Sequence, residues 1–140
     1  MNKKYTYEDL VEVLSETYYL KGNDKSIGID GIDMTGIAGK TQLTFIDKNR
    51  TDKAELLSNC SAGLIIGDEE LLIHRNQNQN ILIVQNPKVC FSLISNKFFV
   101  HRPIPALSDK AIIDGAAKIG KGVYIGPNSI IGKVEIGDNS

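Results

Sequence analysis

The sequence predicts a small α/β N-terminal domain followed by the start of a left-handed parallel β-helix made of hexapeptide repeats. Three observations support this. Up to residue 100, apolar runs of strand length alternate with helix-start signals. Pro103 and Pro105 then make a stiff linker, after which isoleucines recur every six residues. We therefore expect a domain at 1–100, a linker at 101–106 and a β-helix at 107–140, which looks truncated.

The composition is that of an ordinary globular protein. The chain has 140 residues, 41% of them hydrophobic and 24% charged, with a formal net charge of −1. A strongly basic face, which would favour nucleic acid, is not indicated. The N-terminus lacks the apolar core of a signal peptide, and no run is long enough for a transmembrane segment. With only two cysteines, reduced thiols and a cytoplasmic location are expected.

The first predicted helix lies in "YTYEDLVEVL", residues 5–14. Thr6 followed by Asp9 is a capping-box pair. Leu10, Val13 and Leu14 share one helical face, so this helix should pack against a core.

The next elements follow from short local signals. Strands are expected in "TQLTFI" (41–46), "AGLIIG" (62–67) and "ILIV" (81–84). A short helix is expected in "TDKAELLSN" (51–59), with Asp52 as its cap, and a longer one begins at Asn86 as cap with Pro87 at the first helical position. The acidic run at 68–70 and the polar tract at 74–80 are interpreted as solvated connections.

The repeat carries the most specific signal. Four isoleucines lie six residues apart, and a small or β-branched residue stands two positions before each of them. A period of six does not suit an α-helix, whose period is 3.6, but it suits a triangular β-helix coil made of three hexads. Glycines that follow the isoleucines should supply backbone freedom at the corners. The repeating isoleucines are Ile113, Ile119, Ile125 and Ile131, and the step to Ile136 is one residue shorter.

The order and spacing of four segments resemble those of the UDP-3-O-acylglucosamine N-acyltransferases of lipid A biosynthesis in Gram-negative bacteria. The segments are "YTYEDLVEVL", "GIAGKTQLTFI", "NPKVCFSLI" and "AIIDGAAKIGKGVYIGPNSIIG". The resemblance implies a homotrimer that transfers a 3-hydroxyacyl chain from acyl carrier protein to the 2-amino group of UDP-3-O-acylglucosamine. It implies a β-helix histidine as general base. Residues 107–140 contain no histidine, so this chain alone is predicted to bind the nucleotide sugar without catalytic activity.

The resemblance also suggests substrate-binding residues. Phe45 matches an aromatic that stacks on uracil in the family, although an inward-facing strand residue is an equally good interpretation. Lys48 stands where the family has Asn, Asn49 is one place later, and Thr51 replaces a Tyr. Lys48 could meet the diphosphate instead.

Other kinds of site are not predicted. "GIAGKT" (36–41) lacks the first glycine of a phosphate loop, since Met34 occupies that position. His74 and His101 have no partners at metal-ligand spacing, and Cys60 and Cys90 lack an obvious neighbouring base. We expect no catalytic residue within this chain, no metal and no cofactor.

Two alternatives remain open. One is another hexapeptide-repeat acyltransferase acting on nucleotide-linked amino sugars, although the Gly-rich fingerprint with which several of those begin is not found here. The other is a non-catalytic module for trimerisation or partner binding. Binding of UDP-N-acetylglucosamine would separate this second alternative from the leading interpretation.

Overall fold

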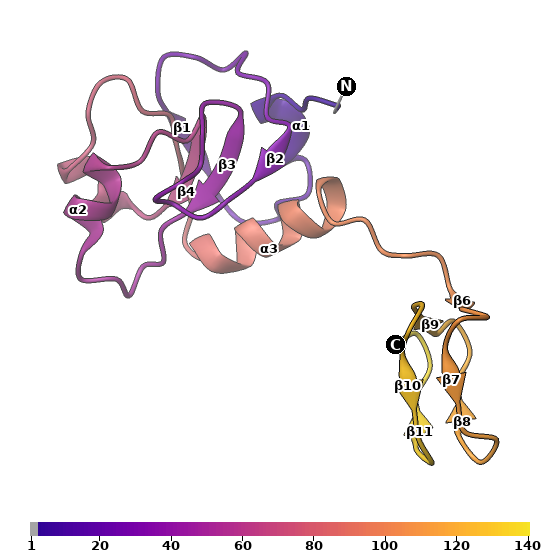
Figure 1. Cartoon of the computed structure of the whole chain (residues 1–140). Coiled ribbons are helices and arrows are strands. Elements are labelled where there is room, and N and C mark those ends of the chain that lie inside the picture. The colour runs from indigo at the N-terminus through magenta and orange to yellow at the C-terminus, as the bar shows by residue number, and fades with distance from the viewer. Residues whose placement is uncertain (1–2) are drawn as a thin grey trace. The chain divides into compact units, whose positions relative to one another are not determined.

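The computed structural model describes residues 3–140 and divides the chain into two compact units, Met1–Val100 and His101–Ser140 (Figure 1). The first unit is a small α/β unit built on one five-stranded sheet in the order β1-β5-β4-β3-β2. Its elements are α1 (Tyr7–Val11), β1 (Tyr19–Lys21), β2 (Gly31–Ile32), β3 (Gln42–Phe45), α2 (Lys53–Ser58), β4 (Leu64–Gly67), the 3₁₀ helix η1 (Glu69–Ile73), β5 (Ile81–Ile83) and α3 (Pro87–Phe98).

Four strands of this sheet are parallel. β2 pairs with β3, β3 with β4 and β4 with β5, all in parallel, whereas β1 joins the edge of β5 in antiparallel orientation. The carboxyl ends of β2 to β5 therefore lie along one edge of the sheet, where open parallel sheets usually bind ligands. The predicted strands in residues 41–46, 62–67 and 81–84 are confirmed as β3, β4 and β5.

Both faces of the sheet are covered, which explains why its central strand is continuously apolar. Leu64 and Ile66 of β4 pack into a core that includes residues of α1 and α3. Ile65 points to the other face and joins a second core that includes Leu57 of α2 and Leu71 of η1. All four residues of β4 are buried.

The first helix starts as predicted but ends before Val13 and Leu14, the last residues of its predicted apolar face. The Thr6 hydroxyl accepts from the Asp9 backbone N–H at 3.3 Å, and the Asp9 carboxylate accepts from the Thr6 backbone N–H at 2.7 Å. This confirms the capping box. The helix ends at Val11, yet Val13 and Leu14 still pack against the same core.

Asp52 and Asn86 precede α2 and α3 as predicted, but neither side chain forms the predicted capping hydrogen bond. The carboxylate of Asp52 makes no capping bond to α2, because it pairs with Arg50. The Asn86 side chain does not cap α3 either, since its Oδ1 accepts from Lys48 Nζ at 3.3 Å. Pro87 does occupy the start of α3.

Two segments that were predicted to be solvated are partly buried. Lys53 of α2 is only 3% exposed. Its ammonium group donates to Asp68 at 2.9 Å and also to Glu70, so two carboxylates of the acidic run bind a buried cation. In the polar tract, Gln79 and Asn80 are buried and donate to backbone carbonyls, which satisfies polar groups inside the fold.

The second unit consists of six two-residue strands in three parallel pairs. The first three strands each pair with the third strand after them, so β9, β10 and β11 lie beside β6, β7 and β8 (Figure 1). The register Ile136↔Ile119 is kept, so the shorter step before Ile136 is absorbed in the connection between β10 and β11. The strands are β6 (Ala106–Leu107), β7 (Ile112–Ile113), β8 (Lys118–Ile119), β9 (Tyr124–Ile125), β10 (Ile130–Ile131) and β11 (Glu135–Ile136).

The predicted role of the glycines at the corners is wrong. Left-handed backbone conformation occurs at Gly122, Asn128 and Asn139, and not at the glycines that follow the isoleucines. Asn tolerates this conformation better than most residues. Gly120 is required for a different reason, because a Cβ there would lie 2.6 Å from the backbone nitrogen of Asp138 in the paired turn.

The helices of the described part, residues 3–140, include none that is both long and apolar enough to span a membrane.

Candidate functional site

The candidate site is a cavity of about 670 Å³ at the carboxyl ends of β2 and β3. Segments that directly follow these two strands form most of its wall, and α2 and α3 each contribute one side chain. This is the edge at which parallel strands present side chains and free backbone groups to a ligand. The lining residues are Ile32, Asp33, Met34, Thr35, Gly36, Thr44, Phe45, Ile46, Asp47, Arg50, Leu56 and Phe91.

An aromatic pair forms part of the wall. The rings of Phe45, at the end of β3, and Phe91, on α3, have centroids 4.7 Å apart and planes tilted by 32°. Both side chains are only partly buried and pack against the first core. Phe45 is thus a strand residue of the core and a wall of the cavity at once. An apolar ring face open to a cavity can stack on a planar ligand.

A short hydrogen-bond chain holds the loop after β2 against β3. The Thr35 hydroxyl donates to the Phe45 carbonyl at 3.0 Å and lies 3.3 Å from the hydroxyl of Thr44. Because the Thr35 hydrogen is used on this carbonyl, the Thr44 hydroxyl is the donor between the two threonines. The backbone beside Phe45 is therefore fixed by side chains of the cavity itself.

Two carboxylates bring acceptors into the cavity. Asp33 accepts from the Met34 backbone N–H at 2.8 Å, and Asp47 accepts from the Asn49 backbone N–H at 2.8 Å. Each carboxylate has lone pairs left for a ligand N–H or O–H.

Arg50 is the single positively charged side chain among the residues that line the cavity. Its Nε donates to Asp52 Oδ1 at 2.7 Å, and its Nη2 donates to the other oxygen of the same carboxylate. These hydrogen bonds raise the pKa of Arg50 and lower the pKa of Asp52. A two-point contact of this kind fixes the plane of the guanidinium group.

The structure separates the three residues suggested by the sequence. Phe45 lines the cavity, whereas Lys48 and Asn49 are exposed residues of the turn after β3 and are not among the lining residues. Lys48 reaches Asn86 at the start of α3. Thr51 is also exposed and outside the lining.

Sequence reasoning missed Phe91 and Arg50. Phe91 packs against the first core, as an apolar residue of a helix is expected to do, and the same ring also reaches the cavity. Arg50 stands two positions before Asp52, and that spacing was the available signal for an ion pair.

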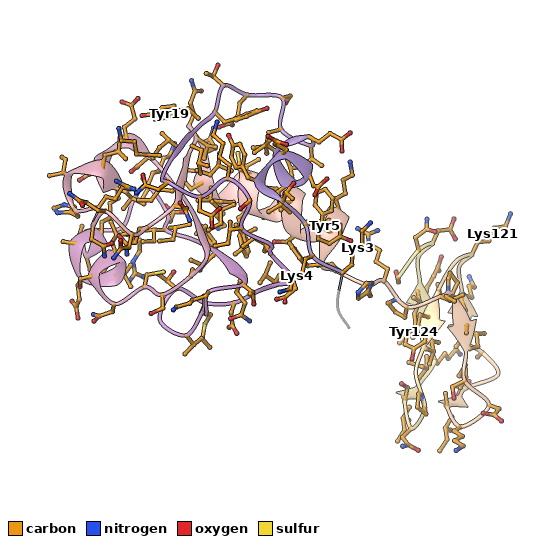
Figure 2. All side chains as sticks on the ribbon, turned by 90° about the horizontal axis from the view of Figure 1, so that it is seen from above. Lys3, Lys4, Tyr5, Tyr19, Lys121 and Tyr124 are labelled. Carbon is orange, nitrogen blue, oxygen red and sulfur yellow. The ribbon has the colours of Figure 1, made fainter. Side chains whose placement is uncertain are left out.

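A second cavity, of about 540 Å³, lies at the ends of β4 and β5 and differs in charge. Asp68, Glu69 and Glu70 line it, and Tyr19 donates its hydroxyl to Glu69 at 3.3 Å. Tyr19, which lines this second cavity, lies well away from Tyr5 and Lys3 of the first unit (Figure 2). No cation is among its described lining residues, and Lys53 already pairs with Asp68 and Glu70, so this cavity offers an anionic ligand such as a nucleotide no free positive charge.

Other reactive groups in the described residues do not form sites. Within residues 3–140, no three His, Cys, Asp or Glu side chains gather so as to hold a metal ion. Cys60 and Cys90 are buried free thiols, and burial raises the pKa of Cys90 to about 12. The segment 36–41 joins β2 to the strand β3 and does not open a helix, unlike a phosphate loop.

Comparison with known proteins identifies the family. The sequence model described as UDP-3-O-(3-hydroxymyristoyl) glucosamine N-acyltransferase, LpxD, matches residues 26–97. This range includes every lining residue of the candidate site at the carboxyl ends of β2 and β3, which we call the Phe45 cavity. Two relatives named UDP-3-O-acylglucosamine N-acyltransferase are also similar. The protein from Ruthia magnifica subsp. Calyptogena magnifica is 34% identical over 118 residues, which cover 79% of this chain and 33% of the relative.

The second relative, from Psychrobacter cryohalolentis, is 29% identical over 125 residues, covering 86% of this chain and 36% of the relative. The chain therefore spans about a third of the length of these two relatives. Because the family's sequence model matches about half of the present chain, including the sheet edge and α3, the resemblance inferred from the four segments is confirmed. This chain belongs to the UDP-3-O-acylglucosamine N-acyltransferase family.

Proposed function

We propose that this chain is the N-terminal, nucleotide-sugar-binding part of an enzyme of lipid A biosynthesis. That enzyme transfers a 3-hydroxyacyl chain from acyl carrier protein to the 2-amino group of UDP-3-O-acylglucosamine. The observation that carries the proposal is that the family match contains the whole Phe45 cavity, at the sheet edge where parallel strands bind ligands.

The cavity suits the uracil end of such a substrate. A base stacks on an aromatic ring whatever its hydrogen-bonding edge, and each such contact is worth ~1–3 kcal/mol. Phe45 and Phe91 offer the aromatic surface. Uracil also carries one ring N–H, for which Asp33 or Asp47 supplies an acceptor in the same cavity.

The second unit supports a structural part of the proposal. Its first three strands each pair with the third strand after them, as the turns of a β-helix with three sides do. We propose that residues 107–140 start a left-handed parallel β-helix, that 101–106 is its linker, and that the enzyme is a homotrimer. Since 107–140 contain no histidine, the chain alone is proposed to bind substrate without transferring the acyl group. The cytoplasmic location expected from the sequence belongs to the same proposal.

The test is a calorimetric titration of the 140-residue chain with UDP-N-acetylglucosamine, a soluble substrate analogue without the 3-O-acyl chain. Saturable binding is expected, and Phe45→Leu should weaken it about tenfold, since stacking is lost while the apolar volume is largely kept. Phe98→Leu is the matched control, because Phe98 packs against Tyr5 and is not among the cavity's lining residues.

The outcomes separate the competing functions. Equal loss in both variants would point to general destabilisation and contradict the cavity as the site. No binding of the analogue to the wild-type chain would favour the trimerisation or partner-binding module.

A further inference from the structure

A capping residue that does not cap is the starting observation. Asp52 precedes α2 at the N-cap position, where an Asp normally accepts from a backbone N–H of the first helical turn. Here no such bond forms, and the carboxylate instead binds both Nε and Nη2 of Arg50. A local rule that a sequence breaks is expected where a side chain has another task.

The ion pair between Arg50 and Asp52 leaves the edge of the guanidinium group that faces away from Asp52 free for another ligand. Arg has five N–H donors, of which the Asp52 carboxylate occupies two. Both hydrogens of Nη1 and one of Nη2 remain, and hydrogen bonds from two guanidinium nitrogens match the oxygens of a phosphate group. About half of the Arg50 side chain is exposed (52%), so these donors are accessible.

The charges in the cavity restrict where an anion can be held. Asp33 and Asp47 are acidic, and Arg50 is the single cationic residue of the lining. A phosphate is therefore favoured only where it meets Arg50. Lys48, the cation suggested by the sequence, is outside the lining and contacts Asn86 at 3.3 Å.

We propose that Arg50 binds a phosphate of the nucleotide held in the Phe45 cavity, and that Asp52 is a positioning residue that orients the Arg50 guanidinium. This inference rests on the proposed function, because it requires a nucleotide in this cavity. It assigns recognition of the nucleoside diphosphate to Arg50 rather than to Lys48.

The experiment compares UDP with uridine, which differ by the diphosphate alone. Dissociation constants for both are measured by NMR titration of the 140-residue wild-type chain and of Arg50→Gln. The variant should weaken UDP binding about tenfold, the value of a charge-assisted contact at a partly exposed site, and leave uridine binding unchanged. Arg50→Lys, which keeps the charge without the fork, should give an intermediate loss.

Two further variants remove one positive charge elsewhere. Lys40→Gln is the control, because Lys40 is exposed and precedes β3 at its amino end, the end opposite Phe45. Its UDP affinity should stay within about twofold of wild type, the size of a surface charge effect. Lys48→Gln tests the rival assignment, and a loss in it that exceeds the loss in Arg50→Gln would overturn the proposal.

The failure of each idea is visible separately. If neither UDP nor uridine binds wild-type protein, the proposed function fails and this inference with it. If both bind and Arg50→Gln keeps the wild-type preference for UDP, only the role of Arg50 is refuted.

The role of Asp52 has its own readout. Asp52→Ala should lower UDP affinity in the wild-type background but have no further effect when combined with Arg50→Gln, since Asp52 acts through Arg50. Uridine binding and the unfolding midpoint report any general damage. An increase in UDP affinity in Asp52→Ala would mean that the carboxylate competes with phosphate, which contradicts a positioning role.

Discussion

Phe45 and Phe91 stack obliquely across the boundary between β3 and α3, with ring centroids 4.7 Å apart and planes tilted by 32°. The pair joins the first core to the candidate site, because both rings pack on that core and both line the cavity. Ligand binding and the packing of α3 on the sheet are therefore expected to depend on the same two side chains.

Replacing the two rings singly and together should reveal their coupling. Phe45→Leu and Phe91→Leu each lose the aromatic contact, so the double variant should be less destabilised than the sum by about 0.5–1.5 kcal/mol in urea unfolding. Phe45→Leu combined with Phe98→Leu is the control and should be additive, because those rings form no aromatic pair with each other. Additivity in both pairs would show that the Phe45–Phe91 contact has no energetic weight.

Removal of the buried ammonium group of Lys53 should destabilise the first unit. Burial opposes its charge, but hydrogen bonds to Glu70 and Asp68 outweigh this, so the pKa of Lys53 lies above its usual value. Lys53→Met leaves two carboxylates without their cation. We expect a loss of about 1–2 kcal/mol, below that of a fully buried pair because the Glu70 side chain is 60% exposed.

The matched surface variant is Lys97→Met, which removes a pair with Glu12 at 3.8 Å. It should change the free energy of unfolding by less than about 0.5 kcal/mol. Similar losses in the two variants would show that burial of Lys53 has no special weight.

The capping box should make stability depend on acid pH. Two hydrogen bonds from Thr6 lower the pKa of Asp9 in the folded state. The bond from the Thr6 backbone N–H has the larger effect, and the bond from the Thr6 hydroxyl has the smaller one. A carboxyl group with a lowered folded pKa stabilises the fold above its unfolded pKa, near 3.9, and this contribution disappears as pH falls through the folded pKa.

Urea unfolding of wild type and Asp9→Asn between pH 7 and pH 2 checks this sign. The stability difference between the two proteins should be largest at neutral pH and should shrink below about pH 4. A difference that stays constant over this range would argue against a role for the Asp9 charge.

Gly63 should not tolerate a side chain. It directly precedes β4, is buried, and a Cβ there would collide with the backbone carbonyl oxygen of Lys40. Gly63→Ala should cost about 1–3 kcal/mol, because a backbone obstacle cannot move aside as a flexible side chain can. Gly36→Ala has open space around its Cβ and should be neutral or slightly stabilising in the same thermal-unfolding measurement.

Much of the fold follows from local patterns. The strands β3, β4 and β5 form within the apolar runs that predict them, and Thr6 and Asp9 bond to each other as their spacing requires. The six-residue period is also reflected in exposure, since Ile113, Ile119 and Ile131 are partly covered and Ile125 is buried, whereas Ile112 and Ile130 are exposed.

Two of the failed predictions share one cause, which is that a polar side chain contacts a partner distant in the sequence. Asn86 meets Lys48 instead of its own helix, and Asp68 meets the buried Lys53. Each prediction assumed that the nearest backbone group or water would satisfy the side chain. Packing of the helices on the sheet brought stronger partners within reach.

The amino-acid sequence alone therefore settles where β3, β4 and β5 lie, how α1 begins and which family the chain resembles, because these depend on side chains a few positions apart or on a regular period. The cavity was decided only by tertiary structure. Its wall needs Phe45 from β3, Phe91 from α3 and Arg50 from the turn between β3 and α2. Phe91 is distant in the chain from Phe45 and Arg50, and it reaches the same cavity only when burial of both faces of the sheet sets the helices in place.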